Sequence, residues 1–206
     1  MENHARFRSF VAEMTRLVEN SAGDEAKILD QGSRLLGALV GTDDWLPDAA
    51  TKPHPEYYQQ HLLYCDPLER FSVVSFVWGP GQTTPVHDHT VWGMVGMLRG
   101  AELCKAYAVP TAGKPMAAGE TKTLKPGEVE KLSPRIGDVH QVSNALADKV
   151  SISIHVYGAN IGAVKRHVFD PATGKAKDFV SGYSSPLLPN FWDRSAEVRA
   201  ELAKSA

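Results

Sequence analysis

Short runs of β-forming residues, separated by glycine and proline, fill the middle of this chain. The runs are Phe71–Trp78, Val91–Leu98, Glu102–Val109, Val150–Tyr157 and Val164–Phe169. Dipeptides that favour turns stand between them, at Pro80-Gly81, Pro126-Gly127 and Ile136-Gly137. Many short strands at such intervals are typical of a β-sandwich or a small β-barrel. The chain is therefore predicted to be mainly β.

Helical segments flank this β-rich region. Apolar residues recur at helical spacing over 4–20 and over about 24–40, and a short closing helix is predicted over 193–204. No internal repeat or low-complexity tract divides the chain. We therefore expect all 206 residues to form one domain, with a helical extension at 1–48 and a β-barrel core at 57–170.

Charge and cysteine content narrow the possible partners. The chain has 22 Lys and Arg against 24 Asp and Glu, and its basic residues are scattered singly, which argues against nucleic-acid binding. No signal peptide is evident and no window is long enough to cross a bilayer. Cys65 and Cys104 are far apart and are expected to be free thiols. We expect a cytoplasmic protein that acts on small molecules, away from membranes.

A pair of histidines begins the most informative motif. His87 and His89 are two residues apart in a stretch that leads into a strand, and residues i and i+2 of a strand project from the same face. Both imidazoles could therefore bind one metal ion. Gly81 lies six residues before His87, and Gly100 lies eleven after His89. This spacing resembles the first motif of the cupins, which are small metal-binding β-barrels.

A third histidine follows at the spacing of the second cupin motif. Pro134 precedes Gly137, His140 lies three residues after Gly137, and Asn144 lies four after His140. The block departs from the motif by one extra residue between the proline and the glycine. Two such motifs in the correct order predict that His87, His89 and His140 share one metal ion. Three unrelated histidines in a β domain are the alternative.

The predicted metal site has no acidic ligand. Where cupins usually have a ligand glutamate, this chain has Gly93. Three neutral imidazoles leave the metal with its full double positive charge and with open coordination positions. Such a site suits an anionic substrate together with oxygen better than it suits 2-oxoglutarate chemistry, which uses two histidines and a carboxylate. Imidazole also binds Zn, Cu and Ni, so the ligands alone do not select iron.

The run from Val150 to Tyr157 alternates apolar and polar residues without exception. Ser153, His155 and Tyr157 share its polar face. Such a face is ordinarily exposed to solvent. Near a metal, however, the three side chains could form a hydrogen-bonded relay that orients the tyrosine hydroxyl.

Together, the three histidines and the Ser-His-Tyr row resemble the cysteine dioxygenase family of cupin thiol dioxygenases, from about Tyr57 to Phe169. The resemblance implies one Fe(II) per chain on His87, His89 and His140. It also implies a small thiol carboxylate and O₂ as substrates and a sulfinate as product. Metal binding would deprotonate a thiol whose free pKa is about 8.5. Tyr157, oriented by His155 and Ser153, would donate a hydrogen bond to substrate or oxygen.

Two departures distinguish branches of that family. The cysteine that animal members crosslink to the tyrosine is matched by Gly93, so no crosslink is expected. The arginine that they use for the substrate carboxylate is also missing. Gln60 and Arg166 resemble the pair found in bacterial 3-mercaptopropionate dioxygenases. Gln59 is a rival for the role of Gln60, and Arg166 could instead be a surface charge. The resemblance thus implies either 3-mercaptopropionate or L-cysteine, and a neutral glutamine favours the former.

Two other functions remain as alternatives. A cupin with another metal could cleave a diketone or isomerise a sugar, although the missing glutamate and the Ser-His-Tyr row argue against it. A non-catalytic cupin could serve as a metal-dependent sensor or binding protein. Oxygen consumption with a thiol separates both from a dioxygenase.

Overall fold

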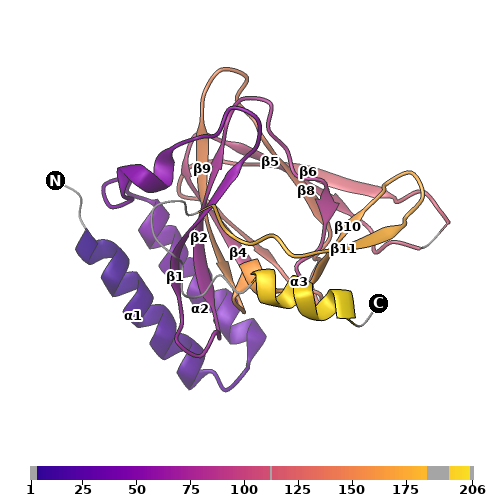
Figure 1. The fold of residues 1–206 in the computed structure, drawn as a ribbon. Coiled ribbons are helices and arrows are strands. Elements are labelled where there is room, and N and C mark those ends of the chain that lie inside the picture. The colour runs from indigo at the N-terminus through magenta and orange to yellow at the C-terminus, as the bar shows by residue number, and fades with distance from the viewer. Residues whose placement is uncertain (1–3, 112, 185–194, 205–206) are drawn as a thin grey trace.

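The computed structural model describes residues 4–111, 113–184 and 195–204, which form a β-barrel with the two N-terminal helices on one side (Figure 1). The helices are α1 (His4–Asn20), α2 (Glu25–Val40) and α3 (Ser195–Lys204), with 3₁₀ turns η1 (Asp48–Thr51) and η2 (Ile161–Ala163). The prediction of a mainly β chain with N-terminal helices is confirmed. Positions 193 and 194 of the predicted closing helix lie outside the described residues.

The strands form two antiparallel sheets that face each other. The five-stranded sheet has the order β1 (Gln59–Cys65), β2 (Ser72–Trp78), β9 (Ser151–Tyr157), β4 (Gly93–Arg99) and β7 (Val129–Leu132). The six-stranded sheet has the order β11 (Ala176–Phe179), β10 (Arg166–Phe169), β3 (Val86–His87), β8 (His140–Asn144), β5 (Glu102–Tyr107) and β6 (Ala118–Leu124). Non-consecutive strands are neighbours in both sheets, which brings residues distant in sequence into one interior.

The five predicted β runs correspond to β2, β4, β5, β9 and β10, with ends that shift by at most two residues. Other strands carried weaker signals. β6 has the sequence AGETKTL and is exposed over most of its length, so no apolar alternation marks it. β3 is only two residues long. Both are held by strand pairing rather than by the local pattern.

Helices α1 and α2 cover the outer face of the five-stranded sheet (Figure 1). Asp24 caps α2 by accepting a hydrogen bond from the Lys27 backbone N–H at 3.1 Å. Leu36 of α2 is fully buried against β4, where a Cβ on Gly96 would lie 2.8 Å from Leu36 Cγ. The missing side chain at Gly96 therefore lets the helix lie close to the sheet.

Strand β9 separates an apolar layer from a polar interior. Ile152, Ile154 and Val156 belong to the core beneath the helices. The alternate residues of β9 face the barrel interior, and the whole strand is buried. The alternative of a solvent-exposed polar face is therefore wrong, because the six-stranded sheet covers that face.

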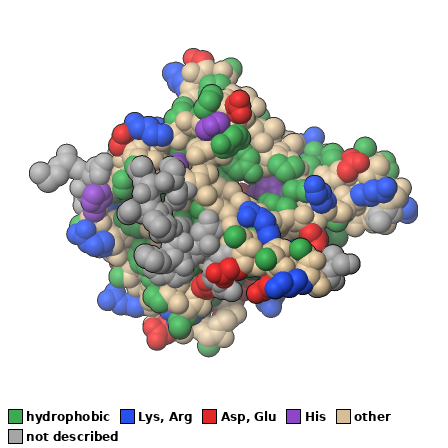
Figure 2. All heavy atoms as spheres, in the orientation of Figure 1, with side chains coloured by type: hydrophobic (Ala, Val, Ile, Leu, Met, Phe, Trp, Pro, Cys, Tyr) green, Lys and Arg blue, Asp and Glu red, His purple; other side chains and the backbone are tan. Residues whose placement is uncertain are grey.

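Charged side chains of both signs are scattered over the face shown in Figure 2, without a basic stripe. Within the described ranges, no helix combines the length and the apolar character that crossing a bilayer requires.

Replacing Leu36 with alanine should lower the free energy of unfolding by about 2–5 kcal/mol, because it opens a cavity between α2 and the sheet. Chemical denaturation measures the change. Leu68→Ala is the control: Leu68 is 73% exposed, so its truncation should cost little. An equal loss in both variants would contradict this packing.

Candidate metal centre and active site

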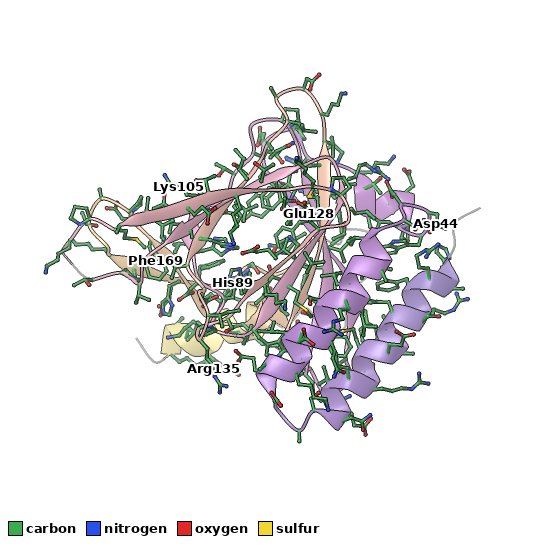
Figure 3. The ribbon with its side chains drawn as sticks, turned by 180° about the vertical axis from the view of Figure 1, so that it is seen from behind. Asp44, His89, Lys105, Glu128, Arg135 and Phe169 are labelled. Carbon is green, nitrogen blue, oxygen red and sulfur yellow. The ribbon has the colours of Figure 1, made fainter. Side chains whose placement is uncertain are left out.

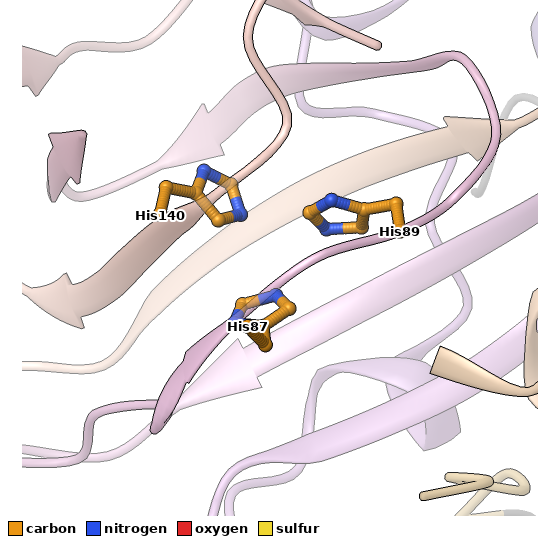
Figure 4. A group of neighbouring side chains, drawn as sticks. All are labelled: His87, His89 and His140. Atoms are coloured by element: carbon orange, nitrogen blue, oxygen red, sulfur yellow. The ribbon is translucent and has the colours of Figure 1, made fainter. Parts of the chain in front are cut away.

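Three histidine rings meet inside the barrel (Figure 4). His87 on β3 and His140 on β8 are direct partners across an antiparallel pair. His89 follows β3 and points into the interior between the sheets (Figure 3). Each pair of ring centroids is separated by 4.8 Å. The structure thus brings together the three predicted metal ligands.

The reason for this convergence differs in part from the prediction. β3 ends at His87, so His89 is not on a strand, and Thr90 adopts a left-handed backbone with φ of 61°. Asp138 fixes this turn by accepting hydrogen bonds from the backbone N–H groups of His89 at 3.1 Å and Thr90 at 2.9 Å. Strand geometry therefore places only His87 of this pair. His89 is placed by the carboxylate of Asp138.

Each of the three rings uses its Nδ1 atom to contact another group. Nδ1 lies 3.0 Å from the Pro85 carbonyl oxygen in His87 and 2.9 Å from Asp138 Oδ1 in His89. In His140 it lies 3.2 Å from Cys104 Sγ. Nε2 is left as the nitrogen that can bind an ion, and in His89 it is buried without a hydrogen-bond partner. Metal-binding histidines typically have such a partner behind the ring.

Burial keeps the three imidazoles neutral. It lowers the pKa of His87 and of His89 well below the usual value and that of His140 to about 4. A neutral ring can donate its lone pair to a metal. Among the described residues, the cluster of candidate ligands contains no acidic side chain. This donor set fits a divalent transition-metal ion.

Gly93 pairs with Tyr157 across β4 and β9. A Cβ at Gly93 would lie 2.9 Å from Tyr157 Cδ1 and 2.9 Å from Leu132 Cδ1. The tyrosine ring therefore occupies the space that a side chain at this position would need. Glycine supplies neither an acidic ligand nor a thiol for a crosslink, as the sequence indicates.

Ser153, His155 and Tyr157 form a continuous hydrogen-bonded row. Ser153 Oγ lies 2.8 Å from His155 Nε2, and His155 Nδ1 lies 2.7 Å from the Tyr157 hydroxyl. Burial raises the pKa of Tyr157 and lowers that of His155 well below its usual value, so both are neutral near pH 7. The Tyr157 ring stacks on His89 at a centroid distance of 5.4 Å. The row therefore ends beside the metal centre.

A cavity of about 170 Å³ opens beside these residues. Its lining includes His87, His140, His155, Tyr157, Gln60 and Arg166. Gln60 faces the cavity, whereas Gln59 is not part of the lining. Arg166 is only 5% exposed, so the alternative of a surface charge is wrong.

Two serines after β11, Ser181 and Ser184, contact the two polar lining residues Arg166 and Gln60. Arg166 donates to Ser181 Oγ at 2.7 Å, while its Nε is buried without a partner. The Gln60 N–H donates to Ser184 Oγ at 3.1 Å, and the Ser184 N–H donates to the Gln60 carbonyl at 2.8 Å. A buried guanidinium with an unpaired N–H suits an anionic ligand.

Several residues of the site carried no recognised sequence signal. Asp138 stands two residues before His140, and carboxylates often orient metal-binding histidines. This position was therefore a signal that could have identified it. Tyr58 and Trp78 line the cavity, but aromatic residues in strands are ordinary core residues. His61, on the same strand as Gln60, lies outside the lining.

Replacing Asp138 with asparagine should weaken the binding of a divalent transition-metal ion by about 10- to 100-fold, because His89 loses the carboxylate that orients its ring. Anaerobic titration against a competing chelator measures the affinity. Asp178→Asn is the matched control, since Asp178 lies at the surface near Lys165. Unchanged affinity in the Asp138 variant would contradict its role.

Comparison with known proteins gives the family. Similar solved structures include a double-stranded β-helix protein from Klebsiella pneumoniae (19% identity, TM-score 0.43, 59% of this chain and 95% of that one). TT1209 from Thermus thermophilus is another, with 20% identity and a TM-score of 0.43 over 55% of this chain and 96% of that one. A cupin superfamily protein from Desulfitobacterium hafniense has 12% identity and a TM-score of 0.42 over 57% of this chain and 93% of that one. A family model, cysteine dioxygenase type I, matches residues 56–170, more than half of the chain. The chain, with its two facing antiparallel sheets, therefore belongs to the cysteine dioxygenase type I family.

Proposed function

We propose that this protein is an Fe(II)-dependent dioxygenase that adds both atoms of O₂ to the sulfur of a small thiol carboxylate and yields the sulfinate. One observation carries the proposal. The three-imidazole cluster, to which no acidic side chain of the described residues belongs, opens on the same cavity as the buried Arg166. Family membership supports a thiol as the substrate.

His87, His89 and His140 would hold the iron through Nε2, since their Nδ1 atoms contact other groups. Bound iron would supply the site at which the thiol loses its proton and dioxygen is activated. The pocket walls are aromatic and aliphatic, from Phe76, Trp78 and Val168 among others. They exclude bulk water from the reacting sulfur, and this strengthens electrostatic interactions inside the cavity.

Arg166 would bind the substrate carboxylate. Its guanidinium is held in place from two sides, by the Ser181 hydroxyl and by the Phe179 ring, whose centroid lies 4.6 Å away. Gln60 adds a neutral polar group to the same cavity. A carboxylate at Arg166 directs the other end of a short substrate toward the histidines.

The cavity favours 3-mercaptopropionate over L-cysteine. Within the described part of the chain, its lining contains no aspartate or glutamate that could accept an ammonium group. The α-amino group of cysteine would therefore enter next to Arg166 without an acidic partner. Leaving a buried polar group unpaired costs about 1–3 kcal/mol, and more when it is charged.

Tyr157 would present its hydroxyl to the bound substrate or oxygen. The row of Ser153 and His155 behind it fixes the direction of that hydroxyl, and the raised pKa keeps its proton in place at neutral pH. The tyrosine can then donate a hydrogen bond to negative charge that develops near the metal.

The iron-loaded protein should consume oxygen with 3-mercaptopropionate at a kcat/KM roughly 5- to 150-fold above that with L-cysteine. An oxygen electrode with both thiols and cysteamine measures this. Arg166→Gln should raise the KM for the carboxylate substrates, while Lys165→Gln, next to it at the surface, should not. A higher kcat/KM with L-cysteine than with 3-mercaptopropionate would contradict the substrate assignment. Tight thiol binding without oxygen uptake would instead identify a binding protein.

Tyr157→Phe should lower kcat by roughly 10- to 100-fold and leave the iron content unchanged, because only the hydroxyl at the end of the row is lost. Turnover and metal analysis are measured on the same preparation. Tyr57→Phe, at a 54% exposed position, is the control. Loss of iron in the Tyr157 variant would mean that the residue is structural.

A further inference from the structure

Beyond the residues just assigned, one buried acid points at the far end of the Ser-His-Tyr row. Glu102 begins β5 of the six-stranded sheet, while Ser153 lies on β9 of the opposite sheet. The Glu102 side chain is only 1% exposed. Its carboxyl interacts with the Ser153 hydroxyl and the Trp78 indole N–H, and Oε1 is buried without a hydrogen-bond partner. Isolated acids are seldom buried in this way without a role.

We propose that Glu102 is a positioning residue and the fourth member of the row, and that its protonation state decides whether Tyr157 offers a proton or a lone pair to the cavity. This inference deepens the proposed function, because it assigns the group that orients the hydroxyl used there.

The hydrogen-bonding capacity of Ser153 makes this possible. A hydroxyl donates one hydrogen bond and accepts two. The Trp78 indole N–H donates to Ser153 Oγ at 3.2 Å and takes up one acceptor position. One donor and one acceptor position remain, and they are shared between His155 on one side and Glu102 on the other. Whichever of these two donates, the other must accept.

Two arrangements of the hydrogen bonds therefore give every member of the row a partner. With Glu102 protonated, its O–H donates to Ser153 Oγ, and the Ser153 O–H donates to His155 Nε2. His155 Nδ1–H then donates to the Tyr157 oxygen, so that the Tyr157 O–H points into the cavity as a donor. With Glu102 ionised, every hydrogen bond reverses, and Tyr157 donates to His155 instead.

The two arrangements differ by one proton. When Glu102 loses its hydrogen, that hydrogen passes to Ser153, the Ser153 hydrogen passes to His155 Nε2, and the Nδ1 hydrogen passes to Tyr157. The original Tyr157 hydrogen leaves through the cavity. One bond to hydrogen breaks and one forms at each intermediate group, so Ser153, His155 and Tyr157 all remain neutral.

The surroundings favour the arrangement in which Tyr157 is a donor. Burial raises the pKa of Glu102 to about 8, against the smaller lowering by Ser153 and Trp78. The neighbouring titratable groups are Cys104 on β5 and His155 and Tyr157 on β9. The pKa of Cys104 is raised to about 12, that of Tyr157 is raised and that of His155 is well below its usual value. Of these four groups, Glu102 alone changes charge between pH 6 and 9.

Glu102→Gln tests the proposal because a glutamine amide donates like the protonated acid and cannot ionise. Its kcat at pH 7 should stay within about twofold of wild type. Wild type is expected to lose kcat above pH 8, where Glu102 ionises, and the variant should not show this loss. Glu102→Leu, which cannot donate, should lose about tenfold at all pH values. Glu120→Gln, at an exposed position on β6, is the matched control and should keep the wild-type profile.

Two measurements on the metal-free protein keep this test independent of turnover. In infrared spectra, wild type should show the C=O band of a protonated carboxylic acid that Glu102→Gln lacks and that disappears near pH 8. The free energy of unfolding should also depend on pH through the ionisation of Glu102. Between pH 4.5 and 8 the folded protein holds a proton that the unfolded chain has lost. The unfolding constant of wild type relative to Glu102→Gln should therefore rise by up to about tenfold per pH unit.

The outcomes separate the two proposals. A wild-type-minus-variant spectrum without a protonated acid at pH 6–7 overturns the role of Glu102, as does a Glu102→Gln enzyme that keeps the wild-type fall above pH 8. The infrared and stability results do not depend on the substrate. If they appear while no thiol drives oxygen uptake, the proposed function fails and the four-membered row remains.

Discussion

The antiparallel pairing of β3 with β8 is the contact on which the site depends. It places His87 directly opposite His140, although 52 residues separate them in sequence. Asp138, just before β8, then reaches back to the turn after β3 and fixes the third ring. One short strand pair and one carboxylate thus assemble three ligands from two segments. Their neutrality follows from burial between the two sheets, because desolvation disfavours the charged imidazolium.

The other half of the site is built on the opposite sheet. β9 has an apolar side that packs beneath the helices and a polar side that faces the cluster of three histidines. The helices therefore contribute to the chemistry indirectly: they hold the strand whose inner side carries Ser153, His155 and Tyr157. Phe76 stacks on His155 at 4.1 Å and helps keep that ring in the row. Glu102 reaches the same row from the facing sheet, so the row connects both halves of the barrel interior.

Much of this could be predicted from sequence, for reasons that individual residues illustrate. The helices and the long strands follow from local periodicity. The spacing of the His87, His89 and His140 motifs points to one metal site, and strict alternation places Ser153, His155 and Tyr157 on one face. What failed depends on contacts between distant segments. The turn at His89 is set by Asp138, and the burial of Arg166 depends on Ser181 and Phe179. Glu102 looked like an ordinary strand residue, because the facing Ser153 lies 51 positions further along the chain.

The segment 181–184, whose serines contact Gln60 and Arg166, has a consequence for how such a pocket can diversify. Ser181 and Ser184 fasten these two residues from outside the strands that carry the histidines. The histidine cluster and the residues proposed to bind the substrate carboxylate are thus positioned by separate stretches of polypeptide. For the proposed thiol carboxylate substrates, substitutions at 181–184 would lengthen or shorten the reach between sulfur and carboxylate while the triangle of histidines keeps its shape.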